Sequence, residues 1–179
     1  IPIPVTDVSE SRPTATPALD LGAARVSIRS WLLASSVAVG LSLIFWWPLY
    51  SGGGLVGGDI YTYFIPQKAY LAEHLERGEL PLWNNRVGHG YPVVGESQTG
   101  LFYPFHLLYA VLGVSAAYNT VQLVHYVLAF LFTWAFARQL GLGDVAGLLV
   151  GLVYVYGWFP PRIVLEWAIL GGTWLPAAL

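Results

Sequence analysis

Asp59 is the side chain of this sequence that is best placed for acid–base chemistry. It follows Gly57 and Gly58, shortly after a long apolar stretch, and the aromatic residues Tyr61 and Tyr63 come next. A carboxylate in a turn beside an apolar layer is partly desolvated, which raises its basicity and favours a general base. The structural alternative is that Asp59 caps the helix that follows it.

A second group of polar residues lies in a loop that is dense in glycine, proline and aromatic residues. Arg86 could bind phosphate oxygens through its bidentate guanidinium fork, and His89 through either ring nitrogen. A histidine among glycines also has structural roles, so both interpretations of His89 stay open. The sequence holds no phosphate-binding glycine loop, dinucleotide fingerprint or nucleophile elbow. No pair of the other histidines has the spacing of a zinc site; these are His74, His106 and His125.

The composition is that of a membrane protein. The 179 residues are 56% hydrophobic and 10% charged, with a mean hydropathy of +0.60, whereas a soluble domain is about 25% charged and less than half apolar. The net charge of −2 provides no basic surface, so nucleic acid is excluded as a partner. The chain has no cysteine, which excludes disulfides, thiolate metal sites and cysteine nucleophiles.

Two apolar stretches are long enough to cross a bilayer. Residues 31–50 carry no charge and would rise about 30 Å as a helix, which is the thickness of a bilayer core. Residues 120–138 form the second predicted span. Positive residues mark the cytoplasmic flank of a span, and Arg12, Arg25 and Arg29 precede the first one. We therefore expect the N-terminus in the cytoplasm.

The two ends of the chain differ in character. Residues 1–30 are rich in Pro, Thr, Ser and Ala and predict an extended tail with no core of its own. Residues 144–159 predict a third transmembrane helix, which is short for lipid and suits a place among other helices. Within it, Gly147 and Gly151 would let another helix approach closely. Residues 160–179 are interpreted as the start of a further membrane segment, so we expect a longer protein.

Residues 51–119 are expected to form an external region between the first two spans. Pro66 can open an amphipathic helix that Gly78 closes. Its apolar face would contain Phe64, Lys68, Leu71 and Leu75, and its other face Glu73, Glu76 and Arg77. This helix is predicted to lie along the membrane surface with its Glu residues solvated.

The stretch 101–114 is the ambiguous part of the external region. Its fourteen residues include a proline and a histidine and are too few to span a bilayer. We expect an interfacial helix. If the stretch did span the membrane, the following segments would have the opposite orientation.

The external region and the segments after it resemble a known family. The relevant sequences are GGDIYTYFIPQKAYLAEHLERGELPLWNNRVGHGYPVVGESQTGLFYPFHLLYAVL, RQLGLG and TWLPAAL. They resemble the bacterial YfhO-type membrane proteins, which belong with the glycosyltransferase C superfamily. The family pattern has an Asp soon after the first span, an aromatic–Pro pair, GELPLWNP, a Gly-x-Gly-x-Pro turn, a Gln-containing stretch and FYP. The resemblance covers roughly residues 30–179.

The resemblance implies a function. Such proteins have many more spans than this chain, and transfer a sugar from a polyprenyl-phosphate donor on the outer face of the membrane. Asp59 matches the acidic residue that acts as catalytic base in that superfamily. Arg86, His89 and Gln98 lie in the matching loop and are candidate substrate-binding residues, with no defined role to transfer. No organic cofactor is indicated, and because the superfamily includes metal-dependent and metal-free enzymes, a divalent metal stays open.

Two departures from the family pattern affect the loop geometry. Asn85 stands where a proline is usual, and Glu96-Ser97 replaces a small-residue or Asn-Pro pair. Both leave Asp59 unchanged.

We therefore expect an all-α, multi-pass protein of the bacterial inner membrane, in contact with lipid, with an external amphipathic helix-loop after its first span. The main hypothesis is the amino-terminal part of a YfhO-like glycosyltransferase that acts on an envelope acceptor. The alternative is a non-catalytic accessory subunit of a larger complex, for example an energy-transducing or photosynthetic assembly, which other subunits would contact through the N-terminal tail.

Overall fold

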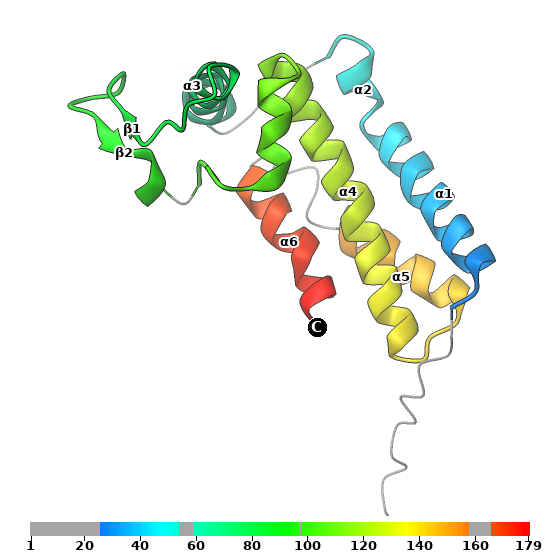
Figure 1. Ribbon diagram of the computed structural model, residues 1–179. Helices are drawn as coiled ribbons and strands as arrows, with labels where there is room; N and C mark the ends of the chain where they lie inside the picture. The colour runs from blue at the N-terminus through cyan, green and yellow to red at the C-terminus, as the bar shows by residue number, and fades with distance from the viewer. Residues whose placement is uncertain (1–25, 54–58, 97, 158–165) are drawn as a thin grey trace, which may run out of the picture.

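The computed structural model describes residues 26–53, 59–96, 98–157 and 166–179, which are mostly helical (Figure 1). The predicted helical fold class is confirmed, and the multi-pass arrangement stays a prediction. A two-stranded antiparallel hairpin pairs Trp83 with Pro92 and Asn84 with Tyr91. In chain order the elements are α1 (Ile28–Phe45), α2 (Trp47–Tyr50), the π-helix η1 (Ile60–Phe64), α3 (Ile65–Glu76), β1 (Trp83–Asn84), β2 (Tyr91–Pro92), the 3-10 helices η2 (Val93–Gly95) and η3 (Pro104–Ala110), α4 (Val114–Gln139), α5 (Asp144–Tyr156) and α6 (Glu166–Ala178).

Two helices in the described part of the chain, α1 and α4, are long and apolar enough to cross a membrane. They have 18 and 26 residues, which at 1.5 Å per residue makes them about 27 and 39 Å long. Both predicted spans therefore correspond to helices. The second helix begins at Val114, before the predicted start of its span at residue 120.

The first span differs from its prediction at both ends. Ser27 caps α1 by accepting a hydrogen bond of 3.1 Å from the Ser30 backbone N–H, so residues 28–30 belong to the helix and not to the tail. Residues 1–25 of the predicted tail lie outside the described residues. The helix ends at Phe45, because Pro48 has no N–H with which to continue the ladder. The chain turns at Trp46 and enters α2, so the expected single helix over 31–50 is wrong.

The helices α1 and α4 pack antiparallel. Near one end the rings of Trp31 and Trp134 lie 4.8 Å apart, and near the other the rings of Trp46 and Tyr126 lie 5.0 Å apart. Figure 1 shows α4 at the centre, with α1, α5 and α6 around it. The end of α1 and the start of α4 therefore lie at the same end of the bundle.

Two glycines of α5 contact α4 closely, as the sequence predicted. A Cβ at Gly147 would lie 2.9 Å from Cδ1 of Trp134, and one at Gly151 would lie 3.2 Å from the ring of Phe130. Side chains larger than hydrogen would therefore separate the two helices. The helix α5 ends at Tyr156, short of the predicted residue 159.

The helix predicted between Pro66 and Gly78 is present as α3, and its external location stays a prediction. Pro66 lies in its first turn, and Gly78 follows its end with a positive φ of 71°. Its apolar face packs against η3 and α4. The large apolar residues of α3, which is described throughout, are buried or half-buried. The apolar face of α3 is therefore covered by protein, where we expected the membrane surface.

The ambiguous stretch 101–114 contains the seven-residue 3-10 helix η3. At about 2 Å per residue, seven residues are too short to cross a bilayer, which agrees with the expectation that this stretch does not span. The final segment contains the 13-residue helix α6, which packs against α4. Residues 158–165 lie outside the described residues.

Candidate functional site

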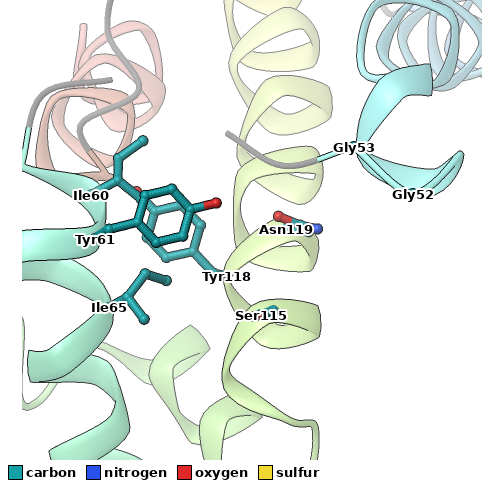
Figure 2. A pocket seen from close by; sticks show the side chains of 8 residues that line it. All are labelled: Gly52, Gly53, Ile60, Tyr61, Ile65, Ser115, Tyr118 and Asn119. Atoms are coloured by element: carbon teal, nitrogen blue, oxygen red, sulfur yellow. The ribbon is translucent and has the colours of Figure 1, made fainter. Parts of the chain in front are cut away.

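A pocket of about 340 Å³ lies at the end of the bundle where α1 leads out and α4 begins (Figure 2). Its walls come from the turn after α2, from η1 and the start of α3, and from the first two turns of α4. Figure 2 shows Asn119 and Ser115 of α4 between Gly52 and Gly53 on one side and Tyr61 and Ile65 on the other. The pocket is lined by Gly52, Gly53, Ile60, Tyr61, Ile65, Ser115, Tyr118 and Asn119.

Asp59 is adjacent in sequence to this lining, because it directly precedes Ile60 and Tyr61. It occupies the cap position of η1, where its backbone carbonyl accepts hydrogen bonds from the N–H groups of Tyr63 (2.8 Å) and Phe64 (3.0 Å). Its side chain makes no capping hydrogen bond, so the structural alternative of a carboxylate cap is not observed. The carboxylate is exposed, and the described residues do not supply the partial desolvation expected from Tyr61 and Tyr63.

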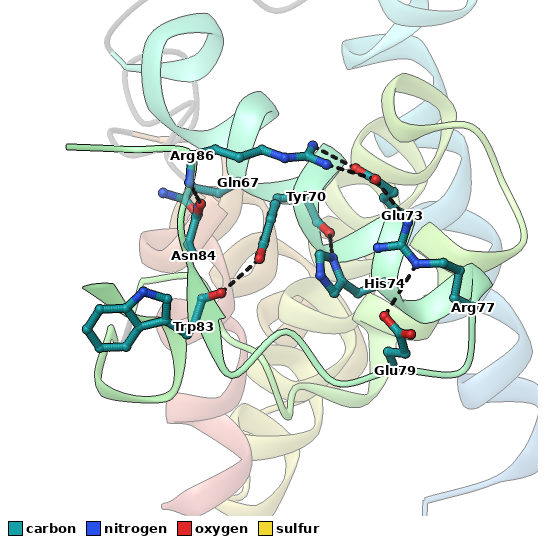
Figure 3. A network of polar contacts seen from close by, with 9 residues as sticks. All are labelled: Gln67, Tyr70, Glu73, His74, Arg77, Glu79, Trp83, Asn84 and Arg86. Atoms are coloured by element: carbon teal, nitrogen blue, oxygen red, sulfur yellow. Dashed lines mark hydrogen bonds and ion pairs between the residues drawn. The ribbon is translucent and has the colours of Figure 1, made fainter. Parts of the chain in front are cut away.

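Arg86 is engaged by Glu73 (Figure 3). Its two terminal nitrogens lie 2.6 and 2.8 Å from the Glu73 carboxylate oxygens, and its guanidinium lies 5.2 Å from the centre of the Tyr70 ring. The hydrogen bonds from Arg86 and then from Arg77 lower the pKa of Glu73 to about 2. The fork that the sequence suggested for phosphate therefore holds a carboxylate, and Glu73 is paired where it was expected to be only solvated.

His89 and Gln98 are both exposed and are not part of the pocket lining. His89 lies in a tight turn between Gly88 (φ 57°) and Gly90 (φ 85°). The structure therefore does not bring the candidate residues Arg86, His89 and Gln98 together with Asp59 around this pocket.

Glu96 is a partly buried carboxylate whose only signal in the sequence is a departure from the family pattern. Its Oε2 accepts hydrogen bonds from the N–H (2.7 Å) and the hydroxyl (2.6 Å) of Thr99. Burial acts to raise the pKa of Glu96, but these hydrogen bonds outweigh it and lower the pKa. Burial and then the hydrogen bond to Glu96 raise the pKa of Tyr63 to about 12. The Glu96 carboxylate thus lies close to the Tyr63 side chain of η1.

A buried lysine joins α3 to the loop that leads into η3. Lys68 is fully buried, and its Nζ donates to the Thr99 carbonyl oxygen (2.8 Å) and lies 3.1 Å from Nε2 and 3.4 Å from Nδ1 of His106. The Gly100 carbonyl lies 2.6 Å from Nδ1 of His106 and can only accept, so Nδ1 carries a proton. The Lys68 ammonium contacts both nitrogens of this ring. The sequence placed Lys68 on the apolar face of the helix, which was a usable signal for its burial.

A second set of hydrogen bonds links the same loop to α4 and α6. The indole N–H of Trp174 donates to the Tyr103 hydroxyl (2.9 Å), and that hydroxyl contacts Nε2 of His125. The Thr173 hydroxyl donates to the His125 carbonyl oxygen (3.1 Å). His125 thus contacts the loop after β2 through its ring and α6 through its backbone.

No group of three or more His, Cys, Asp or Glu residues that could hold a metal ion occurs in the described ranges. Comparisons of the chain with protein-family models, with curated proteins and with solved structures found no match. The YfhO-type assignment therefore stays a prediction that is based on the quoted motifs.

Proposed function

We propose that this chain is part of a membrane glycosyltransferase that moves a sugar from a polyprenyl-phosphate donor to an envelope acceptor, with Asp59 as general base. The observation that supports this proposal is the place of Asp59, directly before the pocket-lining residues Ile60 and Tyr61. The pocket lies at the ends of both helices that could span a membrane. A donor with a lipid tail and a polar head needs a site at such a boundary.

The reaction at this site would be a single displacement. The Asp59 carboxylate accepts the proton of an acceptor hydroxyl while the hydroxyl oxygen forms a bond to the anomeric carbon. The bond between that carbon and the phosphate oxygen breaks, and its electron pair leaves with the polyprenyl phosphate. The exposure of Asp59 makes it accessible to an acceptor. Desolvation would come from the bound lipid and sugar.

The walls of the pocket offer the polar groups that such substrates require. The hydroxyl of Ser115 and the amide of Asn119 can exchange hydrogen bonds with sugar hydroxyls. Ser115 belongs to the first turn of α4, which has no side-chain cap, and helix N-termini favour anions. A leaving phosphate would be stabilised in this position.

The charges near the ends of the bundle support the proposed orientation in the bacterial inner membrane. Arg29 lies in the first turn of α1 and Arg138 in the last turn of α4, at the end opposite the pocket. Asp144 lies at the same end of the bundle. It accepts a hydrogen bond from Ser30 (2.8 Å) and forms an ion pair with Arg138 (3.2 Å). Positive residues favour the cytoplasmic face, which would place Asp59 outside.

The test is sugar transfer by the Asp59→Asn variant of the full-length protein in membranes. The donors would be polyprenyl phosphates that carry radiolabelled glucose, galactose or N-acetylglucosamine. Loss of a general base reduces transfer by about 10²- to 10⁴-fold, and the variant should keep its folded state because the Asp59 side chain makes no capping hydrogen bond.

Glu76→Gln is the matched control, since Glu76 is also an exposed carboxylate in the external region. We expect it to retain the transfer rate of the wild type. Undiminished transfer by Asp59→Asn with a donor that the wild type uses would refute the assignment of Asp59.

The alternative of an accessory subunit gains no specific support. Most of the α1 surface is exposed and apolar, but lipid would cover this surface as well as another subunit would.

A further inference from the structure

We propose that the outer face of the β1–β2 hairpin lies in the interfacial layer of the membrane and anchors the external region to lipid. We use the term outer face for the exposed apolar side chains of the hairpin and its flanks, Leu80, Leu82, Trp83, Val87 and Val94, of which the strand pairing fixes the direction of Trp83. All five side chains are exposed, with Leu82, Trp83 and Val87 at 57%, 55% and 52%. The proposal requires that α1 and α4 span the membrane, and it does not depend on the glycosyltransferase assignment.

The pairing register gives the hairpin two different faces. Trp83 opposes Pro92 and Asn84 opposes Tyr91, and directly opposed residues of an antiparallel pair lie on the same face. Asn84 and Tyr91 both contact Gln67 of α3, so their face is turned toward that helix. Trp83 therefore faces away from α3, as Figure 3 shows for its indole ring.

The hairpin is held rigidly against α3, so its outer face has a fixed direction. The Tyr70 hydroxyl donates to the Trp83 carbonyl oxygen (2.8 Å). A Cβ on Gly90 would clash with Nε1 of Trp83, so the indole ring lies against this glycine. Because the hairpin is already ordered by α3, its outer face can bind a membrane without the entropy cost of ordering a flexible loop.

The charge distribution favours lipid over water. Between Leu80 and Val94 the sequence contains one charged residue, Arg86, and its guanidinium is turned toward Glu73 and Tyr70 of α3. The outer face thus combines a tryptophan with aliphatic residues and keeps the charge on the side of α3. Tryptophan and aliphatic residues are enriched where proteins meet the lipid headgroups.

The position of the hairpin agrees with contact between its outer face and lipid. Figure 1 shows β1 and β2 to the side of the bundle, beyond α3. The start of α4 and the end of α1 mark the level at which these helices would leave the hydrocarbon. A segment that lies beside the bundle at this level would contact the lipid headgroups.

The test uses single cysteines, because the chain contains no cysteine of its own. Spin labels at Leu82→Cys and, separately, Val87→Cys would be measured in nanodiscs of phosphatidylethanolamine and phosphatidylglycerol. Collisions with apolar oxygen and with a water-soluble nickel chelate report the depth of each label. Val39→Cys, near the middle of α1, provides the hydrocarbon reference and Glu76→Cys on α3 the water reference, since both side chains are exposed.

We expect the oxygen-to-nickel collision ratio at positions 82 and 87 to be several-fold above that at position 76 and below that at position 39. Ratios at 82 and 87 equal to that at 76 would place the hairpin in water and overturn the proposal. Protection of both labels from both reagents would indicate a protein partner and overturn it as well. Asp59→Asn would leave these ratios unchanged, so failure of this proposal and failure of the proposed reaction are distinguishable.

Discussion

Substitution of Gly100 by alanine should loosen the contact between the external loop and α3. Gly100 has a φ of +62°, and an added Cβ would lie 2.7 Å from Cε1 of His106. A left-handed conformation costs a residue with a Cβ about 1–2 kcal/mol. His106 is 1% exposed and is held by Lys68 and by the Gly100 carbonyl, so the ring has little room to move. Overpacking of such a site costs about 1–3 kcal/mol more.

Gly78→Ala is the matched control. Gly78 has a similar φ of +71°, but among the described residues no atom outside its immediate neighbours lies within 4 Å of the point that a Cβ would occupy. Gly78→Ala therefore carries only the backbone cost of about 1–2 kcal/mol. The difference between the two variants isolates the contact with His106 at about 1–3 kcal/mol.

Hydrogen exchange in nanodiscs measures this difference locally. At 1.4 kcal/mol per factor of ten, the buried amides of α3 should exchange roughly 5- to 150-fold faster in Gly100→Ala than in Gly78→Ala. Truncation of the ring by His106→Ala should remove most of the additional cost of Gly100→Ala. Equal exchange in the two glycine variants would refute the inference that Gly100 and His106 are tightly packed.

Two further predictions concern the hairpin and the bundle. The pKa of Glu73 is lowered from 4.5 to about 2. Its ion pairs therefore stabilise the fold above pH 4.5, and this stabilisation is lost as the pH falls through 2. In Arg86→Gln, carboxyl NMR titration should show the pKa of Glu73 rising toward 4.5. In thermal unfolding in detergent, Gly147→Ala should destabilise the bundle by up to about 2 kcal/mol through Trp134, whereas Gly40→Ala, with open space around it, should stabilise it by about 0.5–1 kcal/mol. The reverse order would contradict the proposed close contact of α5 with α4.

The elements that local signals define could be predicted from the sequence. Pro66 and Gly78 mark the ends of α3, and uninterrupted apolar stretches mark α1 and α4. The break at Trp46 was missed because the apolar stretch continues through Pro48, whose missing N–H outweighs the hydropathy of the segment. A stronger weight on this proline would have found the end of α1.

The contacts between distant residues could not be predicted in this way. Lys68 and His106 are 38 residues apart, and no local periodicity specifies which residue receives a buried ammonium. The ion pair of Arg86 with Glu73 likewise depends on how the hairpin folds back on α3. The residue types suggested phosphate binding by Arg86, whereas the tertiary structure supplies a carboxylate from the same chain.

The hydrogen bonds of the loop that follows β2 connect the pocket walls to one another. Lys68 ties this loop to α3, and Tyr103 ties it to His125 of α4. Because α3 and α4 both contribute residues to the pocket, a change in the loop should shift these two walls relative to each other. Gly100→Ala should therefore alter both hydrogen exchange and any transfer activity, whereas Asp59→Asn should alter transfer alone. This contrast separates the positioning of the pocket from its chemistry.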